Sequence, residues 1–154
     1  MMFSLLATVV FTITAMQYQV PTLMIAQKDG SACANQFNDA IITNVPKAHR
    51  AYVALVVASI RYAENGKEGR EYGILNKKCP FGYRSQAGWC AATVAKRYNN
   101  WYRNGSHGDF IQYLSSSYAP IGADNDPRGL NKNWIKNVSY YVKRQETMRI
   151  RLGN

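Results

Sequence analysis

The sequence predicts one domain that is mainly α-helical, and three observations carry this prediction. Apolar residues recur at helical spacing in several segments, strand-like alternation is almost absent, and Gly, Asn and Pro separate the apolar segments. With 154 residues, of which 47% are hydrophobic and 18% charged, the chain can bury a sizeable core. Four or five helices and one glycine-rich loop fit this pattern.

Residues 1–27 form an apolar N-terminal arm that contains no charged residue. A helix that spans a bilayer needs about 20 apolar residues, and the arm supplies them only if its Thr, Gln and Pro residues are included. Its β-branched residues also suit an extended strand. Three interpretations stay open: a membrane or interfacial segment, a segment packed against partner subunits, and an export signal without the usual basic start.

Residues 28–46 are polar and mixed, and we expect a linker or a short irregular helix there. A chain that begins near Lys28 should therefore remain soluble and folded. The next segment, residues 47–64, is predicted to be a helix. Pro46 suits its first turn, the apolar run 51–60 indicates burial on most sides, and Asn65-Gly66 can end it.

The remaining elements follow from turn and capping residues. Residues 65–78 contain three glycines and are predicted to be a loop or small β ribbon. Ser85 can cap a helix over 85–102, and Asp109 can cap one over 110–118 that Pro120 ends. Residues 124–129 read as a turn. A last helix starts at Asn131 or Asn133, continues through residue 142 and ends in a basic tail.

The net charge of +10 predicts a polyanionic partner: nucleic acid, an anionic membrane or a bacterial cell wall. The basic residues are scattered along the chain, which favours general attraction to an anionic wall over specific recognition of nucleic acid. Only nine acidic residues and two histidines are present, so a nucleophilic triad or a His-rich metal site is hard to assemble. We expect neither a metal nor a cofactor.

The three cysteines leave two alternatives open. Cys79 and Cys90 bracket a ten-residue loop that a disulfide could close in an oxidising compartment, which would leave Cys33 unpaired. Three unpaired thiols are the other alternative. No CxxC spacing occurs, so a structural zinc site is not expected.

Glu64 is the first candidate catalytic residue. At helical spacing it shares a face with Val57 and Ile60, so its carboxyl should be partly desolvated. Burial and the negative end of the helix dipole both raise the pKa of a carboxyl, as a general acid near neutral pH requires. The alternative is a solvent-facing Glu just past the end of a helix.

The segment Ser59-Ile-Arg-Tyr-Ala-Glu64, followed at a short distance by Tyr72-Gly73-Ile74, resembles two branches of the lysozyme-like fold. In flagellar-rod-type glucosaminidases the catalytic Glu ends a helix and precedes a Phe-Gly-Ile element, and in soluble lytic transglycosylases it precedes Gly-Leu-Met-Gln. Residues 85–94, 109–114, 118–123 and 125–134 resemble segments of small phage-borne proteins of this kind. The resemblance covers residues 47–142, roughly two thirds of the chain.

The resemblance implies that residues 47–154 are a lysozyme-like catalytic domain with Glu64 as general acid. It also implies that Tyr72, Gly73 and Ile74 line the substrate groove and that Tyr118 lies near it. Two departures from the family pattern concern the loop after Glu64, which is shorter than in typical glucosaminidases, and its first residue, which is Asn where transglycosylases commonly have Ser. Sugars also stack on aromatic rings: Tyr98, Tyr102 and Tyr113 are further groove candidates, whereas Trp89, Trp101 and Trp134 are expected in the core.

A second catalytic carboxylate would lie about 5–9.5 Å from the acid. Glu71 is the candidate base or nucleophile, because the glycine-containing loop could fold it toward Glu64. Asp109 and Asp124 are better explained as a helix cap and a turn residue. Without a second carboxylate, the acetamido or 6-hydroxyl group of the substrate would take its part, as in lytic transglycosylases.

The expected function is a peptidoglycan-degrading glycosidase or lytic transglycosylase, carried in a bacteriophage virion and acting on the bacterial cell envelope. Its expected partners are peptidoglycan and, through residues 1–27, other virion subunits or a membrane. The alternative is a structural virion or membrane-associated protein that keeps a lysozyme-like fold without activity. A basic nucleic-acid-binding module is the third interpretation.

Overall fold

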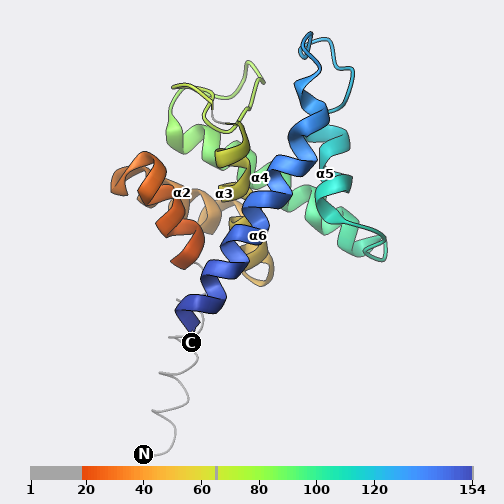
Figure 1. Ribbon diagram of the computed structural model, residues 1–154. Coiled ribbons are helices and arrows are strands. Elements are labelled where there is room, and N and C mark those ends of the chain that lie inside the picture. The colour runs from red at the N-terminus through yellow and green to blue at the C-terminus, as the bar shows by residue number, and fades with distance from the viewer. Residues whose placement is uncertain (1–18, 65, 154) are drawn as a thin grey trace, which may run out of the picture.

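The computed structural model describes residues 19–64 and 66–153 (Figure 1). These residues contain helices and loops but no strand, which confirms the mainly α class and leaves the glycine-rich segment after Glu64 as a loop without β structure. Helical residues 19–29 come first. The elements that follow are α2 (Ser31–Asn44), the 3-10 helix η1 (Lys47–His49), α3 (Arg50–Glu64), α4 (Tyr83–Arg103), α5 (Phe110–Tyr118), the 3-10 helix η2 (Leu130–Asn133) and α6 (Trp134–Gly153).

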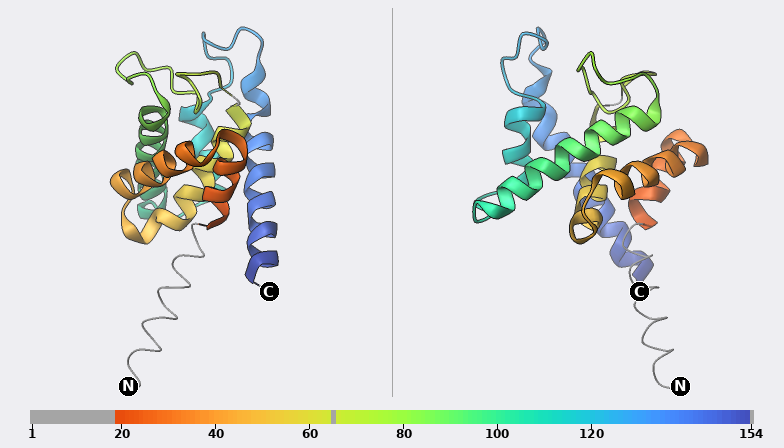
Figure 2. Two further views of the ribbon diagram at one scale, coloured as in Figure 1. Left: turned by 90° about the vertical axis from the view of Figure 1, so that its left-hand side faces the viewer. Right: turned by 180° about the vertical axis from the view of Figure 1, so that it is seen from behind.

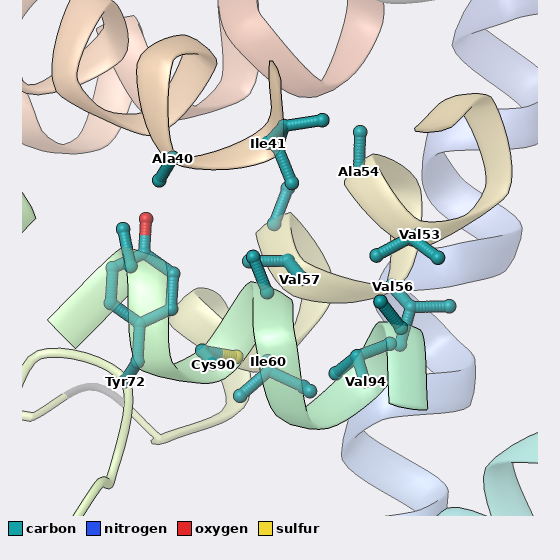
Figure 3. Packing of buried hydrophobic residues seen from close by; sticks show 14 of the residues in the cluster. Ala40, Ile41, Val53, Ala54, Val56, Val57, Ile60, Tyr72, Cys90 and Val94 are labelled. Carbon is teal, nitrogen blue, oxygen red and sulfur yellow. The ribbon is translucent and has the colours of Figure 1, made fainter. Parts of the chain in front are cut away.

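Helix α3 is the centre of the fold, and α2, α4 and α6 pack around it (Figures 1 and 2). Its apolar run was predicted to be buried on most sides, and this is confirmed: Val53, Val56, Val57 and Ile60 are fully buried. Figure 3 shows these side chains between those of α2 and α4. The end of α3, and therefore Glu64, is fixed by contacts on several sides.

Of the two alternatives for residues 28–46, the linker is wrong and the helix is present, but helix α2 is longer and more regular than the short irregular helix expected. Ala34, Phe37, Ala40 and Ile41 form its buried stripe, and α2 packs mainly against α4. Two of these four side chains are alanines, whose contribution to an apolar pattern is weak amid polar neighbours. The domain therefore begins well before residue 47.

Part of the predicted N-terminal arm also belongs to the domain. Val20, Met24 and Ile25 are buried, and the hydroxyl of Tyr62 donates a hydrogen bond to the carbonyl of Met24 at 2.8 Å. Residues 1–18 of the arm lie outside the described residues. In the part of the chain that the structure describes, no helix combines the length and apolarity needed to cross a bilayer.

The helices predicted after residue 46 are present, but the bounds of α3, α4 and α6 differ from the prediction. The first predicted turn, Lys47–His49, is the 3-10 helix η1, and α3 begins at Arg50. Helix α5 has the predicted bounds, and the Asp109 carboxylate accepts a hydrogen bond from the Gln112 amide at 2.9 Å. Helix α4 begins at Tyr83, two residues before the expected cap, because Gly82 leaves the helical conformation at φ 113°. Helix α6 continues to Gly153, so the expected basic tail is helical.

A buried polar network joins the N-terminal helical residues to α3, α4 and the glycine-rich loop. Arg61 binds the carboxylate of Asp29 through two nitrogens at 2.7 and 2.9 Å, and both side chains are about one-tenth exposed. The same carboxylate accepts a hydrogen bond from the Tyr83 hydroxyl at 2.9 Å, and Tyr83 in turn contacts the Tyr72 hydroxyl at 2.7 Å. These contacts fix the loop that follows Glu64.

A chain that begins at Lys28 should therefore fail to fold, contrary to the expectation from sequence. It lacks Met24 and Ile25, and truncating buried side chains of this size typically costs about 2–5 kcal/mol each, against a total stability of about 5–15 kcal/mol. A chain that begins at residue 19 retains these side chains and is the matched control. Circular dichroism melts of both chains test the expectation, and a cooperative melt of the shorter chain near that of the control would contradict it.

Candidate functional site at the end of helix α3

The Glu64 carboxyl is half-buried between α3 and the first residue of α6. Its Oε1 accepts a hydrogen bond of 2.8 Å from the indole nitrogen of Trp134, whose side chain is buried. Burial raises the pKa of Glu64 above its ordinary value of 4.5, while the hydrogen bond from Trp134 acts in the opposite direction. The expected direction of the pKa shift is thus present, with burial as its main cause.

Glu64 also lies directly against the backbone of Gly73. At this glycine φ is +72°, and a Cβ built on it would lie 2.5 Å from Oε2 of Glu64. Both the backbone conformation and the close approach exclude a side chain at this position. The resemblance implies that this glycine lines the substrate groove. In the structure, its missing side chain leaves room for the Glu64 carboxyl.

Three helices hold the segment around Gly73 in place. The hydroxyl of Tyr118, at the end of α5, donates to the carbonyl of Tyr72. The Gln86 amide of α4 pairs with both backbone groups of Ile74, accepting from its nitrogen at 3.2 Å and donating to its oxygen at 3.1 Å. From α3, Arg61 donates to the carbonyl just before Tyr72 at 3.3 Å. The contact between Glu64 and Gly73 is therefore preorganised.

Tyr118 connects this segment to Trp134. Its ring stacks on the indole with 5.4 Å between centroids and an angle of 29°, and its hydroxyl also contacts the sulfur of Cys90 at 3.3 Å. Burial raises the pKa of Tyr118 well above its ordinary value, so the hydroxyl remains a donor. The structure thus brings together three residues singled out from sequence, namely Glu64, Gly73 and Tyr118.

A cleft of about 250 Å³ opens beside Gly73 and Tyr118. A second hollow of about 530 Å³ lies between the end of α2 and α4, and the two share Trp89 and Thr93. The first is lined by Gly73, Ile74, Leu75, Asn76, Trp89, Thr93, Ser117, Tyr118 and Asn125. We call these two neighbouring hollows the groove, and Glu64 contacts the wall of the smaller one through Gly73 without itself lining it.

Two aromatic residues have the opposite burial from the one predicted. Tyr72 is fully buried under the loop, where its hydroxyl is held by the polar network, so it cannot line the groove. Trp89, expected in the core, is partly exposed and lines both hollows. Trp134 is buried and Trp101 packs against the core, as predicted.

The other tyrosine candidates lie away from the groove. Tyr102 is 60% exposed near the end of α4, where its ring lies 6.4 Å from that of Tyr98 and 6.1 Å from that of His49. Tyr113 contacts the same aromatic cluster through Phe110. Since Tyr102 follows Thr93 by nine residues of helix, roughly 13 Å along its axis, it is not part of this site.

Glu71, the candidate second carboxylate, turns into its own loop. It is 7% exposed, its Oε1 accepts a hydrogen bond from the Gly69 amide at 3.0 Å, and its Oε2 is buried without a hydrogen-bond partner. No hydrogen bond or ion pair between described residues joins it to Glu64. Asp109 serves as the α5 cap, and Asp124 is exposed in a turn.

The described residues contain no cluster of His, Cys, Asp and Glu side chains that could hold a metal ion. Cys33, Cys79 and Cys90 are all free, which is the second of the two alternatives left open by the sequence. Cys90 is fully buried, and burial raises the pKa of its thiol to about 12. It therefore remains protonated and serves as a core side chain beside Tyr118.

Three residues of the site were not identified from sequence: Trp134, Gln86 and Trp89. Each stands in a segment that carried the resemblance, but nothing local indicates that an indole reaches Glu64 or that an amide pairs with the backbone at Ile74.

Comparisons with protein-family models, curated proteins and solved structures find no match to this chain. The site is therefore interpreted from its own geometry.

Substituting Gly73 by Ala should destabilise the protein more than the same substitution at Gly122. Both glycines have a φ near +75°, so each alanine carries a backbone cost of roughly 1–2 kcal/mol. A Cβ at Gly122 meets nothing within 4 Å, whereas at Gly73 it meets the Glu64 carboxyl, which should add roughly 1–3 kcal/mol. Urea unfolding measures the difference, and equal losses would refute the contact. The added cost should disappear in a Glu64→Ala background.

The raised pKa of Glu64 predicts how stability depends on pH. A carboxyl that holds its proton more tightly in the folded state contributes stability below pH 4.5, and this contribution is lost as the pH rises through its folded-state pKa. Glu64→Gln is neutral throughout, so its stability relative to the unsubstituted protein should increase above pH 4.5 and then level off. Urea unfolding at a series of pH values measures this difference. A difference that stays flat or falls would contradict the desolvated carboxyl.

Proposed function

We propose that the protein cleaves the aminosugar backbone of peptidoglycan, as a glycosidase or lytic transglycosylase, with Glu64 as general acid. The observation that carries the proposal is the setting of this carboxyl. It is half-buried, its pKa is raised, one oxygen is held by Trp134, and it contacts the wall of a groove through Gly73. A carboxyl group whose pKa is raised holds its proton to a higher pH, which favours its use as the acid that protonates a glycosidic oxygen.

The two oxygens of Glu64 have different surroundings, which suits a directed proton transfer. Oε1 accepts the indole hydrogen bond of Trp134, so the proton is better carried by Oε2, the oxygen next to Gly73. Gly73 lines the cleft, so a sugar bound there would approach the carboxyl from the side of this glycine. Protonation of the glycosidic oxygen would then accompany cleavage of its bond to the sugar carbon.

The environment of Glu71 favours a mechanism with a single protein acid. Its carboxylate is bound within the loop by the Gly69 amide, and Asp109 and Asp124 have structural explanations. The acetamido oxygen of the substrate would attack the sugar carbon as the leaving oxygen takes the proton from Glu64. The ring so formed would be opened by water in a hydrolase or by the 6-hydroxyl of the sugar in a transglycosylase.

The groove and the net charge suit a polymeric, anionic substrate. Trp89 has a partly exposed ring and lines both hollows, and the exposed Arg84 lines the larger one. An indole ring offers a flat apolar face to sugars, and the charge of +10 attracts the acidic polymers of the cell wall. From the resemblance of several segments to phage-borne proteins, we propose that this activity is carried in a virion and acts on the bacterial envelope.

A structural role without catalysis is the second candidate, and one observation favours it. The indole N–H of Trp134 is buried and needs an acceptor, which Glu64 supplies. In a virion or membrane-associated protein of this fold, Glu64 would then serve only to lock α6 onto α3. The two candidates differ in whether wall fragments are released.

Glu64→Gln should abolish digestion of purified peptidoglycan while the protein remains folded, because the amide oxygen still accepts the Trp134 hydrogen bond but the amide has no acidic proton to transfer. Glu68→Gln is the matched control, since Glu68 is exposed in the same loop. Mass spectrometry of the products separates anhydro ends from reducing ends. An unsubstituted protein that releases no products, or a Glu64→Gln variant that keeps full activity, would refute the proposal.

Glu71→Gln tests the single-acid mechanism in the same assay. We expect a loss of activity below about tenfold, which corresponds to about 1.4 kcal/mol of barrier, once the fraction of folded protein is taken into account. A loss of several orders of magnitude, comparable to that of Glu64→Gln in a protein with an unchanged melt, would identify Glu71 as a base or nucleophile.

A further inference from the structure

The C-terminal part of α6 extends beyond the body of the protein. Gln145 is the last buried residue of this helix, and residues 146–152 are exposed or only partly buried. At 1.5 Å per residue, the stretch after Gln145 is about 12 Å long. Figures 1 and 2 show this end of α6 reaching past the other helices. We call residues 143–153 the α6 tip.

The α6 tip is basic and has exposed apolar side chains. It contains Lys143, Arg144, Arg149 and Arg151 against the single acid Glu146, so its net charge is four minus one, or +3. Ile150 is 62% exposed and Leu152 is 54% exposed. The two salt bridges found in the described part of the chain lie elsewhere. Most of the stability of a helix in a protein comes from packing against other elements, and these two turns bury little surface in this domain. Their preservation as helix points to a binding partner.

The N-terminal segment enters the domain at the same end. Val20 and Pro21 line a cavity of about 150 Å³ together with Gln145, Glu146 and Arg149 of α6. The eighteen residues that precede this point in the sequence contain no charged residue and are mostly apolar. The described residues Val20 and Pro21 therefore contact α6 where its exposed C-terminal part begins.

We propose that the α6 tip binds the surface of an anionic lipid bilayer. Its arginines pair with lipid phosphates, and Ile150 and Leu152 enter the boundary between head groups and acyl chains. Stable anchoring to a membrane generally takes two signals, one apolar and one polybasic. The α6 tip carries both kinds of side chain, the apolar Ile150 and Leu152 and the basic Arg149 and Arg151. A second copy of the chain fits this surface less well, because two tips of charge +3 repel each other.

This orientation has a geometric consequence for the groove. Trp134, at the opposite end of α6, contacts Glu64, and the 20 residues of the helix span about 30 Å. With the tip on a bilayer and α6 perpendicular to it, Trp134 and Glu64 would lie at about that distance from the lipid. The inference concerns lipid binding alone, and it holds or fails independently of the proposed enzymatic activity.

Vesicle sedimentation of the full chain tests the proposal. The unsubstituted protein should bind vesicles of phosphatidylcholine and phosphatidylglycerol more tightly than vesicles of phosphatidylcholine alone. The double substitution Arg149→Gln/Arg151→Gln should weaken binding to the anionic vesicles roughly thirtyfold. Each arginine near an anionic surface contributes about 1 kcal/mol, and about 1.4 kcal/mol corresponds to a tenfold change in affinity. It should leave binding to the neutral vesicles unchanged. Circular dichroism should show an unchanged melt, because neither side chain is buried.

The matched control is Lys77→Gln/Lys78→Gln, which removes the same charge from the exposed loop at the far end of the molecule (Figure 1). This control should keep its preference for anionic vesicles. Equal binding of the unsubstituted protein to both kinds of vesicle, or equal losses in the two double variants, would overturn the proposal. So would a lipid-free dimer that the tip substitutions convert to a monomer, because the tip would then bind a second copy.

Limited trypsin digestion provides a second readout that does not depend on affinity. Anionic vesicles should slow cleavage after Arg149 and Arg151 and leave cleavage at Lys77 and Lys78 unchanged, whereas neutral vesicles should do neither. Protection of both regions, or of the loop alone, would contradict the proposed orientation.

Discussion

The ion pair between Asp29 and Arg61 is the interaction on which the rest of the fold depends. It joins the N-terminal helical residues to α3, and through Tyr83 it reaches α4. Both charges are largely removed from water, which is tolerable only because two hydrogen bonds link them and the tyrosine adds a third. Breaking such a pair on one side leaves an uncompensated buried charge, at a cost of about 3–5 kcal/mol. Arg61 also holds the loop carbonyl just before Tyr72, so the same residue supports core and site.

The site brings two carboxyl groups of one short loop region into different environments. Glu64 lies against Trp134 and Gly73 at the groove wall, where burial favours its protonated form. Glu71, seven residues later, is bound by the Gly69 amide inside the loop. The fully buried Tyr72 stands between Glu71, which is bound inside the loop, and Gly73, which lies against Glu64. Only one of the two carboxyl groups therefore lies against the groove wall.

Helix α6 links the two ends of the molecule that we consider functional. Trp134 at its start positions Glu64, and in its middle the Gln145 amide donates to the Ser59 hydroxyl and the Leu55 carbonyl of α3 at 2.7 and 2.9 Å. Beyond Gln145 the helix leaves the core as the basic tip. A single rigid element therefore sets the distance between the groove and the surface proposed for lipid binding.

The sequence by itself determined what depends on neighbouring residues. The helical class, the end of α3 at Glu64, the Asp109 cap and the loop with its glycines all followed from periodicity and turn chemistry, which act over a few residues. The direction of the Glu64 pKa followed as well, because its helix face is apolar. Local patterns failed at α2, where small and polar residues hide a buried stripe, and at α6, which runs on through a basic segment.

Only the tertiary structure decided which distant residues meet. The hydrogen bond between Glu64 and Trp134 spans seventy positions in the chain, and the one between Tyr118 and Tyr72 spans forty-six. Such contacts depend on how whole helices pack, which no local spacing encodes. For the same reason the sequence could not show that Tyr72 is buried while Trp89 faces the groove. Both are aromatic residues at apolar positions, and only the arrangement of α2, α4 and α5 around them separates core from surface.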